Sequence, residues 1–215
     1  MFLRRPAARV VLLDREGRIF LINAEDPLDP FKPAWWEIPG GGIDRGEDSA
    51  VAAARELYEE SGMEDVEMGP VIWTQHVQFT FGGYFFDSHE QIHVAWCDGG
   101  DYRPRHLEAL EAAAFTGARW WTLEDLLASD EPVLPALLRE HLAPIVAGDL
   151  PAEPIDISPV PLDLALAAIR PTSGVGNESE KRLDATPCQP GGQRGHLIGW
   201  PVPPLVHPVT DHPLG

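Results

Sequence analysis

The stretch from Gly41 to Met63 constrains this chain more than any other part of it. Two glycines begin it, residues 48–61 are mostly good helix formers, and Gly62 follows as a helix terminator. At 100° per residue, Glu56, Glu59 and Glu60 fall within an arc of roughly 100° on the helix surface. Carboxylates this close repel one another, so a cation is needed there. Hard divalent cations such as Mg²⁺ are the natural partners of clustered oxygen ligands.

The same helix needs an apolar face. Ala50, Ala54, Leu57 and Ser61 recur at helical spacing, which predicts that they form its buried side. A glutamate-rich helix face on its own is commonly nothing more than solvated surface. The complete spacing of the stretch is what separates this helix from that ordinary case.

That spacing resembles a known signature. Glu47 follows Gly41 after five residues, and seven more residues lead to a run that reads Arg55-Glu56-Leu57-x-Glu59-Glu60-x-Gly62-Met63. This resembles the Nudix box, GX5EX7REUXEEXGU with U aliphatic, and every fixed position matches. The approach Trp36-Glu37-Ile38-Pro39 also resembles the W-x-x-P-G-G of many members. The resemblance covers about residues 4–147 and implies a Nudix hydrolase, which cleaves nucleoside diphosphates linked to another moiety.

The resemblance also implies roles for the box residues. Three carboxylates would ligate one or more divalent cations, Mg²⁺ or alternatively Mn²⁺: Glu56, Glu59 and Glu60. Such ions would neutralise the diphosphate and activate a water for attack at phosphorus. Arg55 would orient a box glutamate, with Glu47 as its partner or as an outer residue of the metal site. Gly41 would offer backbone groups at the edge of the site.

The box does not identify the general base. Glu59 and Glu60 are candidates, but many family members take a further glutamate from a loop beyond the box. Glu90, Glu108 and Glu111 are the candidates of that kind here, and Glu90, between two predicted hairpin strands, is preferred. A carboxylate in this role must reach the attacking water with a hydrogen bond.

The remaining pattern predicts an α/β fold. Apolar runs and alternation predict strands at 8–14, 18–23, 71–81, 84–87, 91–97 and 119–121. Further helices are predicted from Thr122 to Ala128 and from about Pro135, with a short piece at 107–114. These elements are consistent with the α/β/α sandwich that the resemblance implies, in which helices flank a mixed β-sheet.

The composition changes after the last predicted helix. More than half of the 22 prolines lie beyond residue 150. We therefore predict a Nudix domain at 4–147 and a Pro-rich, largely disordered C-terminal tail at 148–215, with a hint of helix only at 162–169. The tail histidines His196, His207 and His212 lack the spacing of a metal site.

Charge and cysteine content narrow the partners and the compartment. A net charge of −18 argues against stable binding to nucleic acid or to anionic membranes, both of which need basic patches. Cys97 and Cys188 form no disulfide framework, and no apolar run approaches the roughly 20 residues of a membrane span. A cytoplasmic protein acting on a small nucleotide or nucleotide-linked diphosphate is predicted. A homodimer is compatible with the family, although no residue selects it.

Two other classes remain open. A noncatalytic Nudix-like sensor would usually lose box glutamates and carry a DNA-binding segment. An isomerase of the isopentenyl diphosphate type shares the fold and would require a core cysteine, for which Cys97 is the candidate.

Within the hydrolases, some ADP-ribose-cleaving members carry a proline where this chain has Phe79. Some dinucleoside-polyphosphate hydrolases carry a tyrosine just beyond, where this chain has Thr80 and Phe81. The leaving group therefore stays open.

Overall fold

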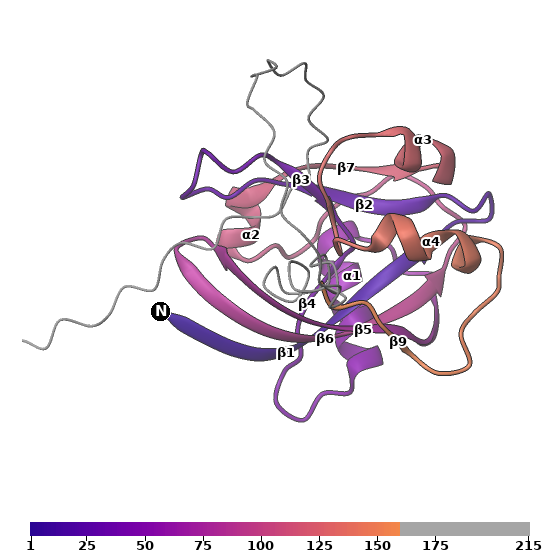
Figure 1. The fold of residues 1–215 in the computed structure, drawn as a ribbon, viewed down its shortest axis with the longest axis horizontal. Coiled ribbons are helices and arrows are strands. Elements are labelled where there is room, and N and C mark those ends of the chain that lie inside the picture. Colours follow the sequence, from indigo (N-terminus) through magenta and orange to yellow (C-terminus); the bar gives the residue numbers. More distant parts are fainter. Residues whose placement is uncertain (160–215) are drawn as a thin grey trace, which may run out of the picture. The chain divides into compact units, whose positions relative to one another are not determined.

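A mixed β-sheet organises the part of the chain that the computed structural model describes, residues 1–159 (Figure 1). The strands of these residues are β1 Phe2–Leu13, β2 Ile19–Ala24, β3 Trp35–Glu37, β4 Gly40–Gly42, β5 Glu67–Phe81, β6 Tyr84–Trp96, β7 Phe115–Trp121, β8 Val133–Leu134 and β9 Ile155–Asp156. The helices are α1 Ser49–Ser61, α2 Ala109–Ala114, α3 Leu123–Ala128 and α4 Leu138–Val146. No helix among them is both long and apolar enough to cross a membrane.

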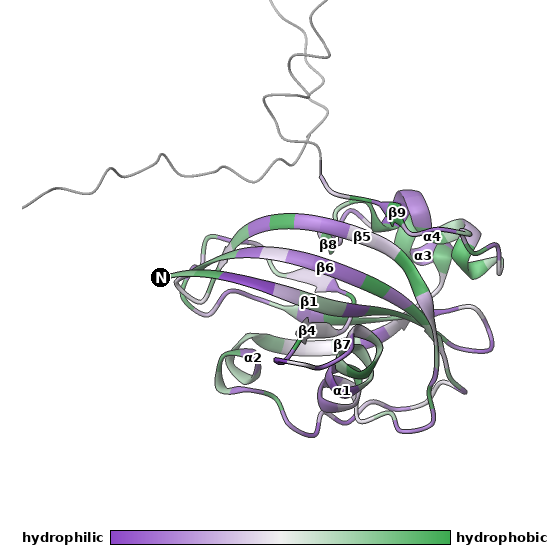
Figure 2. Ribbon diagram, turned by 90° about the horizontal axis from the view of Figure 1, so that it is seen from below, coloured by the Kyte–Doolittle hydropathy of each residue, from purple (hydrophilic) through white to green (hydrophobic). Residues whose placement is uncertain are grey.

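The longest strands lie next to one another in the sheet. Its order is β8-β3-β2-β1-β6-β5-β9, with β4 paired to β1 and β7 paired to β2. β1 and β6 run parallel from the pair Phe2↔Phe85 to the pair Leu13↔Trp96. β5 and β6 form an antiparallel hairpin closed by Gly82 and Gly83, which have φ angles of 56° and 79°. Figure 2 shows β1, β6 and β5 side by side as curved ribbons.

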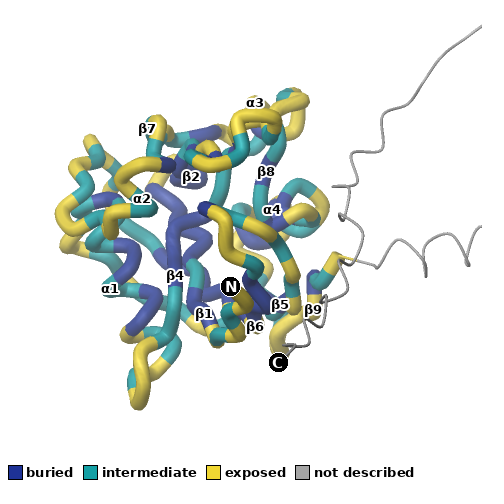
Figure 3. The backbone as a smooth tube through the Cα atoms, turned by 90° about the vertical axis from the view of Figure 1, so that its left-hand side faces the viewer, coloured by how far each residue is buried: buried dark blue, intermediate teal, exposed yellow. Residues whose placement is uncertain are grey.

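Two apolar cores cover the two faces of this sheet. Val11 and Leu13 of β1 belong to the core that contains Leu126 of α3 and three residues of α4: Leu138, Leu142 and Ile145. The intervening Val10 and Leu12 belong to the other core, which contains three residues of α1: Ala52, Ala53 and Leu57. Much of β1 is buried as a result (Figure 3). The predicted α/β/α sandwich with a mixed sheet is confirmed.

The box helix begins and ends where the sequence predicts. The side chain of Asp48 accepts a hydrogen bond from the amide of Ala50 at the N-cap. Gly62 ends the helix at φ 73°, and a Cβ there would lie 2.2 Å from the carbonyl oxygen of Arg103. Only glycine satisfies both the left-handed backbone and this close approach.

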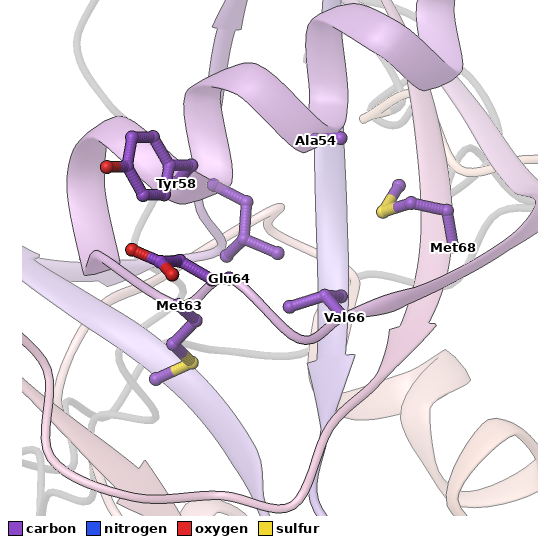
Figure 4. Close-up of a pocket in the computed structure, with 7 residues that line it drawn as sticks. Ala54, Tyr58, Met63, Glu64, Val66 and Met68 are labelled. Atoms are coloured by element: carbon purple, nitrogen blue, oxygen red, sulfur yellow. The ribbon is translucent and has the colours of Figure 1, made fainter.

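The predicted buried face of α1 is partly wrong. Leu57 and Ser61 are buried, but Ala52, Ala53 and Glu56 replace Ala50 and Ala54 as their neighbours. Ala54 instead lines a shallow pocket with Leu57, Tyr58, Met63, Glu64, Val66 and Met68 (Figure 4). Alanines lie on every side of this helix, so their spacing alone cannot identify which side packs on the sheet.

The two strands predicted at 84–87 and 91–97 are one continuous strand. Ser88, His89 and Glu90, where the polar sequence predicts an interruption, pair with both β1 and β5. Glu90 therefore lies within β6 and not in a loop between strands. The alternation predicted in 71–81 is interrupted near its start, where register shifts in β5 bury both Ile72 and Trp73.

Other elements match the predictions closely. Thr122 caps α3 by accepting a hydrogen bond from the amide of Asp125, and α2 occupies most of the predicted short helical piece at 107–114. The last helix starts at Leu138, a little later than predicted, and Pro144 lies inside it near its end.

The first residues of the predicted tail pack on the sheet. β9 pairs in parallel with β5, and the amide of Ile157 donates to the carbonyl oxygen of Thr74 at 2.8 Å. The side chain of Ile157 is 1% exposed and joins the core beneath α4. The structured unit thus extends to Pro159. The rest of the tail prediction, including the helix at 162–169, lies outside the described residues.

Replacing Ile157 by alanine tests this attachment. Because the side chain is buried among α4 and sheet residues, Ile157→Ala is expected to lower the free energy of unfolding by about 2 kcal/mol or more. Urea denaturation measures it. Ile155→Ala is the matched control, since Ile155 is 41% exposed and its loss should cost little. Equal effects of the two substitutions would contradict the packing of this segment.

Candidate active site

The second half of α1 lies against the short glycine strand β4. One carboxylate oxygen of Glu60 accepts a hydrogen bond from the amide of Gly40 at 2.8 Å. The carboxylate of Glu56 lies beside Gly41, where an added Cβ would approach its atoms to 2.7 Å. The first glycine of the box is therefore needed because any side chain there would displace Glu56.

Arg55 connects the box carboxylates to one another. Its Nε and one terminal nitrogen each donate to a different oxygen of Glu47 at 3.0 Å, and that nitrogen also donates to the carbonyl of Gly42 at 3.0 Å. The other terminal nitrogen reaches Glu56 at 2.9 Å and Glu59 at 3.3 Å. The hydrogen bond from Arg55 lowers the pKa of Glu47. A planar guanidinium can make these contacts at once because its donors are fixed in a fork.

The electrostatics of the cluster call for a cation. Burial raises the pKa of Glu60 well above its ordinary value, and the nearby charge of Glu37 raises it further. Burial also raises the pKa values of Glu56 and Glu37, although Arg55 and Arg9 respectively oppose the effect. These carboxyl groups are unfavourable to ionise at the same time. Their oxygen atoms suit a hard divalent cation, because the charge of the cation would offset the repulsion between the carboxylates.

Arg9 of β1 pairs with Gly40 of the glycine strand, and no sequence pattern indicated its role. Its Nε donates to Glu90 at 2.9 Å, and a terminal nitrogen donates to the carbonyls of Ile38 and Gly40 at 3.2 and 3.3 Å. Burial alone would lower the pKa of Arg9, but Glu90 and Glu37 raise it above its ordinary value. Arg9 therefore stays charged and fixes the backbone to which Glu60 binds.

Glu90 is buried at the centre of a hydrogen-bond network. Besides the bond from Arg9, its carboxylate accepts from Gln75 at 2.6 Å and from the hydroxyl of Ser88 at 3.0 Å. Its side chain is 2% exposed. These contacts occupy both oxygens and hold Arg9 in place.

A different glutamate from beyond the box lies near the cluster. Glu111 of α2 is close enough to contribute to the raised pKa values of Glu56, Glu60 and Glu37. One of its oxygens accepts a hydrogen bond from the amide of Glu108 at 2.9 Å, which caps α2. Glu108 serves this cap as the residue before the first turn of α2.

The loop that carries α2 is tied to the end of the box helix. The amide of Arg103 donates to the backbone carbonyl of Ser61 at 2.7 Å. The amide of Arg105 donates to the backbone carbonyl of Glu59 at 2.8 Å. These bonds satisfy carbonyls that the helix leaves free at its C-terminus. They also set the position of Glu111 relative to α1.

Arg5 is a second basic residue that the sequence did not single out, because it looked like part of a basic N-terminus. Its guanidinium lies over the ring of Phe86, 4.9 Å from the centroid. Burial lowers its pKa, while Glu90, Glu56 and Glu111 oppose the effect. Within residues 1–159 its buried Nε has no hydrogen-bond partner. Arg5 thus offers a free donor beside the carboxylate cluster.

Comparison with known proteins agrees with this geometry. A family model described as "NUDIX domain" matches residues 3–142, and the chain belongs to the Nudix family. The RNA pyrophosphohydrolase of Caulobacter vibrioides is 44% identical over 64 residues, 30% of this chain and 36% of that protein. That match spans about a third of the relative's length. The RNA pyrophosphohydrolase of a Wolbachia pipientis strain is 24% identical over 165 residues. This match covers 68% of this chain and 93% of the Wolbachia protein.

A solved structure gives the same fold. The NUDIX hydrolase from Nitrosomonas europaea superposes with a TM-score of 0.52 at 14% identity, covering 72% of this chain and 79% of that one. At this level of identity the likeness concerns the fold alone.

Removing the charge of Glu60 should stabilise the metal-free protein. When folding raises the pKa of a carboxyl group, that group does not destabilise the folded protein at a pH below the pKa it has in the unfolded chain. As the pH rises through the higher pKa of the folded state, the group lowers the free energy of unfolding. With a chelator present to remove metal ions, Glu60→Gln is expected to have a higher Tm than the parent protein. The difference in Tm should be small at about pH 4 and larger at about pH 8. Gln can still accept from Gly40. Glu64→Gln, outside the cluster, is the control. A Tm difference independent of pH would contradict the raised pKa.

Proposed function

We propose that this protein is a metal-dependent pyrophosphohydrolase that cleaves a diphosphate linkage in a nucleoside triphosphate or a nucleoside diphosphate derivative. The observation that carries the proposal is the convergence of Glu56, Glu59 and Glu60 around the glycine strand, with one guanidinium contacting two of them. These three side chains would hold Mg²⁺ or, alternatively, Mn²⁺. When bound, the metal would supply charge neutralisation of the diphosphate and a water of lowered pKa.

The chain's own groups would prepare the site for this chemistry. Arg55, itself held by Glu47, orients Glu56 and Glu59, and the amide of Gly40 orients Glu60. Arg5 lies near Glu56 and Glu111, and its guanidinium would bind a non-bridging phosphate oxygen. The positive charge would favour an anionic substrate at an otherwise acidic surface.

Glu111 is the group we propose for taking the proton of the attacking water. It lies near the box carboxylates, and only its bond to the Glu108 amide constrains it among the described residues. Glu90, preferred from the sequence, and box residues Glu59 and Glu60 stay predictions for this role. The three donors that surround Glu90 favour a positioning function, because a base needs a free oxygen directed at water.

The other two classes receive less support. A noncatalytic sensor has no need for a complete carboxylate set, and this chain retains every fixed residue of the box. An isomerase would need Cys97 beside the carboxylates. Cys97 follows the last residue of β6, where its sulfur accepts a hydrogen bond from the amide of Gly99 at 3.3 Å. Burial raises the pKa of this thiol, and the charges of Asp14 and Asp98 raise it further, which disfavours a reactive thiolate. We therefore infer hydrolysis.

Substitution of the proposed metal ligands tests the reaction. Glu56→Gln and Glu60→Gln each remove one anionic oxygen ligand, so each is expected to lower Mg²⁺-dependent kcat/KM by about 100-fold or more. Phosphate and nucleotide release, measured with and without Mg²⁺, reports the change. Glu64→Gln, an exposed glutamate just beyond the box, should turn over like the parent. Parental activity in both box variants would exclude the proposed ligands.

A pair of substitutions separates the proposed base from the buried network. Glu111→Gln can still cap α2, so it should fold normally, lose about 100-fold or more in kcat and lose the acidic limb of the pH–rate profile. Glu90→Gln removes the charged partner of Arg9 and should lower Tm as well as activity. A fully active Glu111→Gln enzyme with its acidic limb intact would reject Glu111 as the base.

The leaving group is best found by a substrate panel. The relatives named RNA pyrophosphohydrolase suggest RNA as a further substrate class, so an oligoribonucleotide with a 5′-triphosphate is tested beside nucleoside triphosphates, dinucleoside polyphosphates, nucleotide sugars and ADP-ribose. The net charge of −18 favours the small nucleotides over a long polyanion. Product identification by NMR assigns the bond that is broken.

A further inference from the structure

A cluster of two histidines and one aspartate lies on the β5–β6 hairpin, on residues to which the proposed hydrolysis assigns no role. His76 of β5 is directly opposite His89 of β6, and Asp87 is two residues before His89. Residues two apart on a strand point to the same face of a sheet, so all three side chains emerge together. One ligand-type atom from each side chain lies within 4.8 Å of the other two.

The side chains of this cluster contact one another above the sheet. The rings of His76 and His89 stack at 4.2 Å between centroids with an interplanar angle of 3°. His76 Nε2 and Asp87 Oδ1 lie 2.5 Å apart, and the other oxygen of Asp87 accepts from Arg4 Nε at 2.7 Å. Arg4 thus leaves one oxygen of the buried carboxylate directed at the imidazoles. Orientation of a ligating carboxylate by an outer hydrogen bond is common in metal sites.

The third strand of this region adds an anionic neighbour. The amide of His76 donates to the hydroxyl of Ser158 at 2.8 Å, just beyond β9. Asp156, in β9, lies within electrostatic reach of the His76 ring. A cation here would thus meet two carboxylates and one guanidinium.

A simple His–Asp ion pair would account for only part of this cluster. His76 and Asp87 suffice for such a pair, and His89 adds nothing to it. The ring of His89 makes no hydrogen bond to another described residue, yet it is aligned with that of His76. Two aligned imidazoles and an oriented carboxylate are the donor set of a zinc-type site.

We propose that His76, His89 and Asp87 form a second metal site, specific for a borderline transition metal such as Zn²⁺. Imidazole suits Zn²⁺, Ni²⁺ and Cu²⁺, whereas Mg²⁺ requires oxygen ligands, so this site and the box carboxylates select different ions. Ligand atoms of a tetrahedral zinc lie about 3.3 Å apart for bonds of about 2.0 Å. Because the two rings are stacked face to face, both exposed imidazoles would have to rotate about their side-chain bonds until their in-plane lone pairs converge on the ion. The bound ion would join β5 to β6.

Calorimetric titration of the full chain with Zn²⁺ in millimolar Mg²⁺ tests the site. Because His196, His207 and His212 lie outside the described residues, the parent for this experiment carries glutamine at all three. One equivalent of Zn²⁺ is expected to bind, and His76→Gln and His89→Gln are each expected to weaken its affinity at least ~10-fold. His106→Gln, at an exposed histidine away from the hairpin, is the matched control and should bind as the parent does.

A second readout separates this site from the box. Zn²⁺ should raise the Tm of the parent and of Glu60→Gln alike, and it should not raise the Tm of His76→Gln or His89→Gln. The two histidine variants should keep parental Mg²⁺-dependent turnover, which also shows that they fold. Absence of Zn²⁺ binding in the parent, or unchanged binding in both histidine variants, would overturn the proposal.

Discussion

The contact on which the site depends is the approach of the glutamates of α1 to a strand made only of glycine. Glu56 lies where a side chain on Gly41 would be, and Glu60 binds the amide of Gly40. Bringing like charges together in a half-buried place is unfavourable by itself. The arrangement persists because guanidinium groups surround it: Arg55 on the helix side, Arg9 beneath the glycine strand and Arg5 at the edge. The fold thus maintains an excess of negative charge that a divalent cation would neutralise.

The hydrogen-bond network around Glu90 differs from the box carboxylates in how fully its oxygen atoms are hydrogen-bonded. Both oxygens of Glu90 accept hydrogen bonds, and the network joins β1, β5 and β6 to the glycine strand through Arg9. A satisfied buried network is rigid, and removing one member leaves a buried charge without a partner. The box carboxylates, by contrast, keep oxygen atoms that no donor among residues 1–159 occupies. Rigidity beneath the site and unsatisfied oxygens within it are both needed to bind a metal in a defined place.

The sequence predicted well what depends on neighbouring residues. The box helix, its Asp48 and Gly62 ends, the Thr122 cap and the strand periods follow from local spacing and side-chain chemistry. The ion pair of Arg9 with Glu90 could not be predicted, because 81 positions separate the two residues. The continuity of β6 was missed for the same reason, since partners on both sides of the strand satisfy Ser88 and Glu90. The pairing of β9 also depends on a distant strand, which composition does not report.

The parallel pairing of β1 with β6 has a consequence for synthesis on the ribosome. β1 leaves the ribosome before β6, the strand that pairs along its whole length and begins only at Tyr84. At 5–20 residues per second, the 81 positions between Arg9 and Glu90 take about 4 to 16 s to translate. Throughout that interval the apolar run of β1 has no sheet partner from β6, and the buried Arg9 has no counter-ion from Glu90. The nascent chain is therefore most exposed to aggregation, and most in need of chaperones, before β6 has been made.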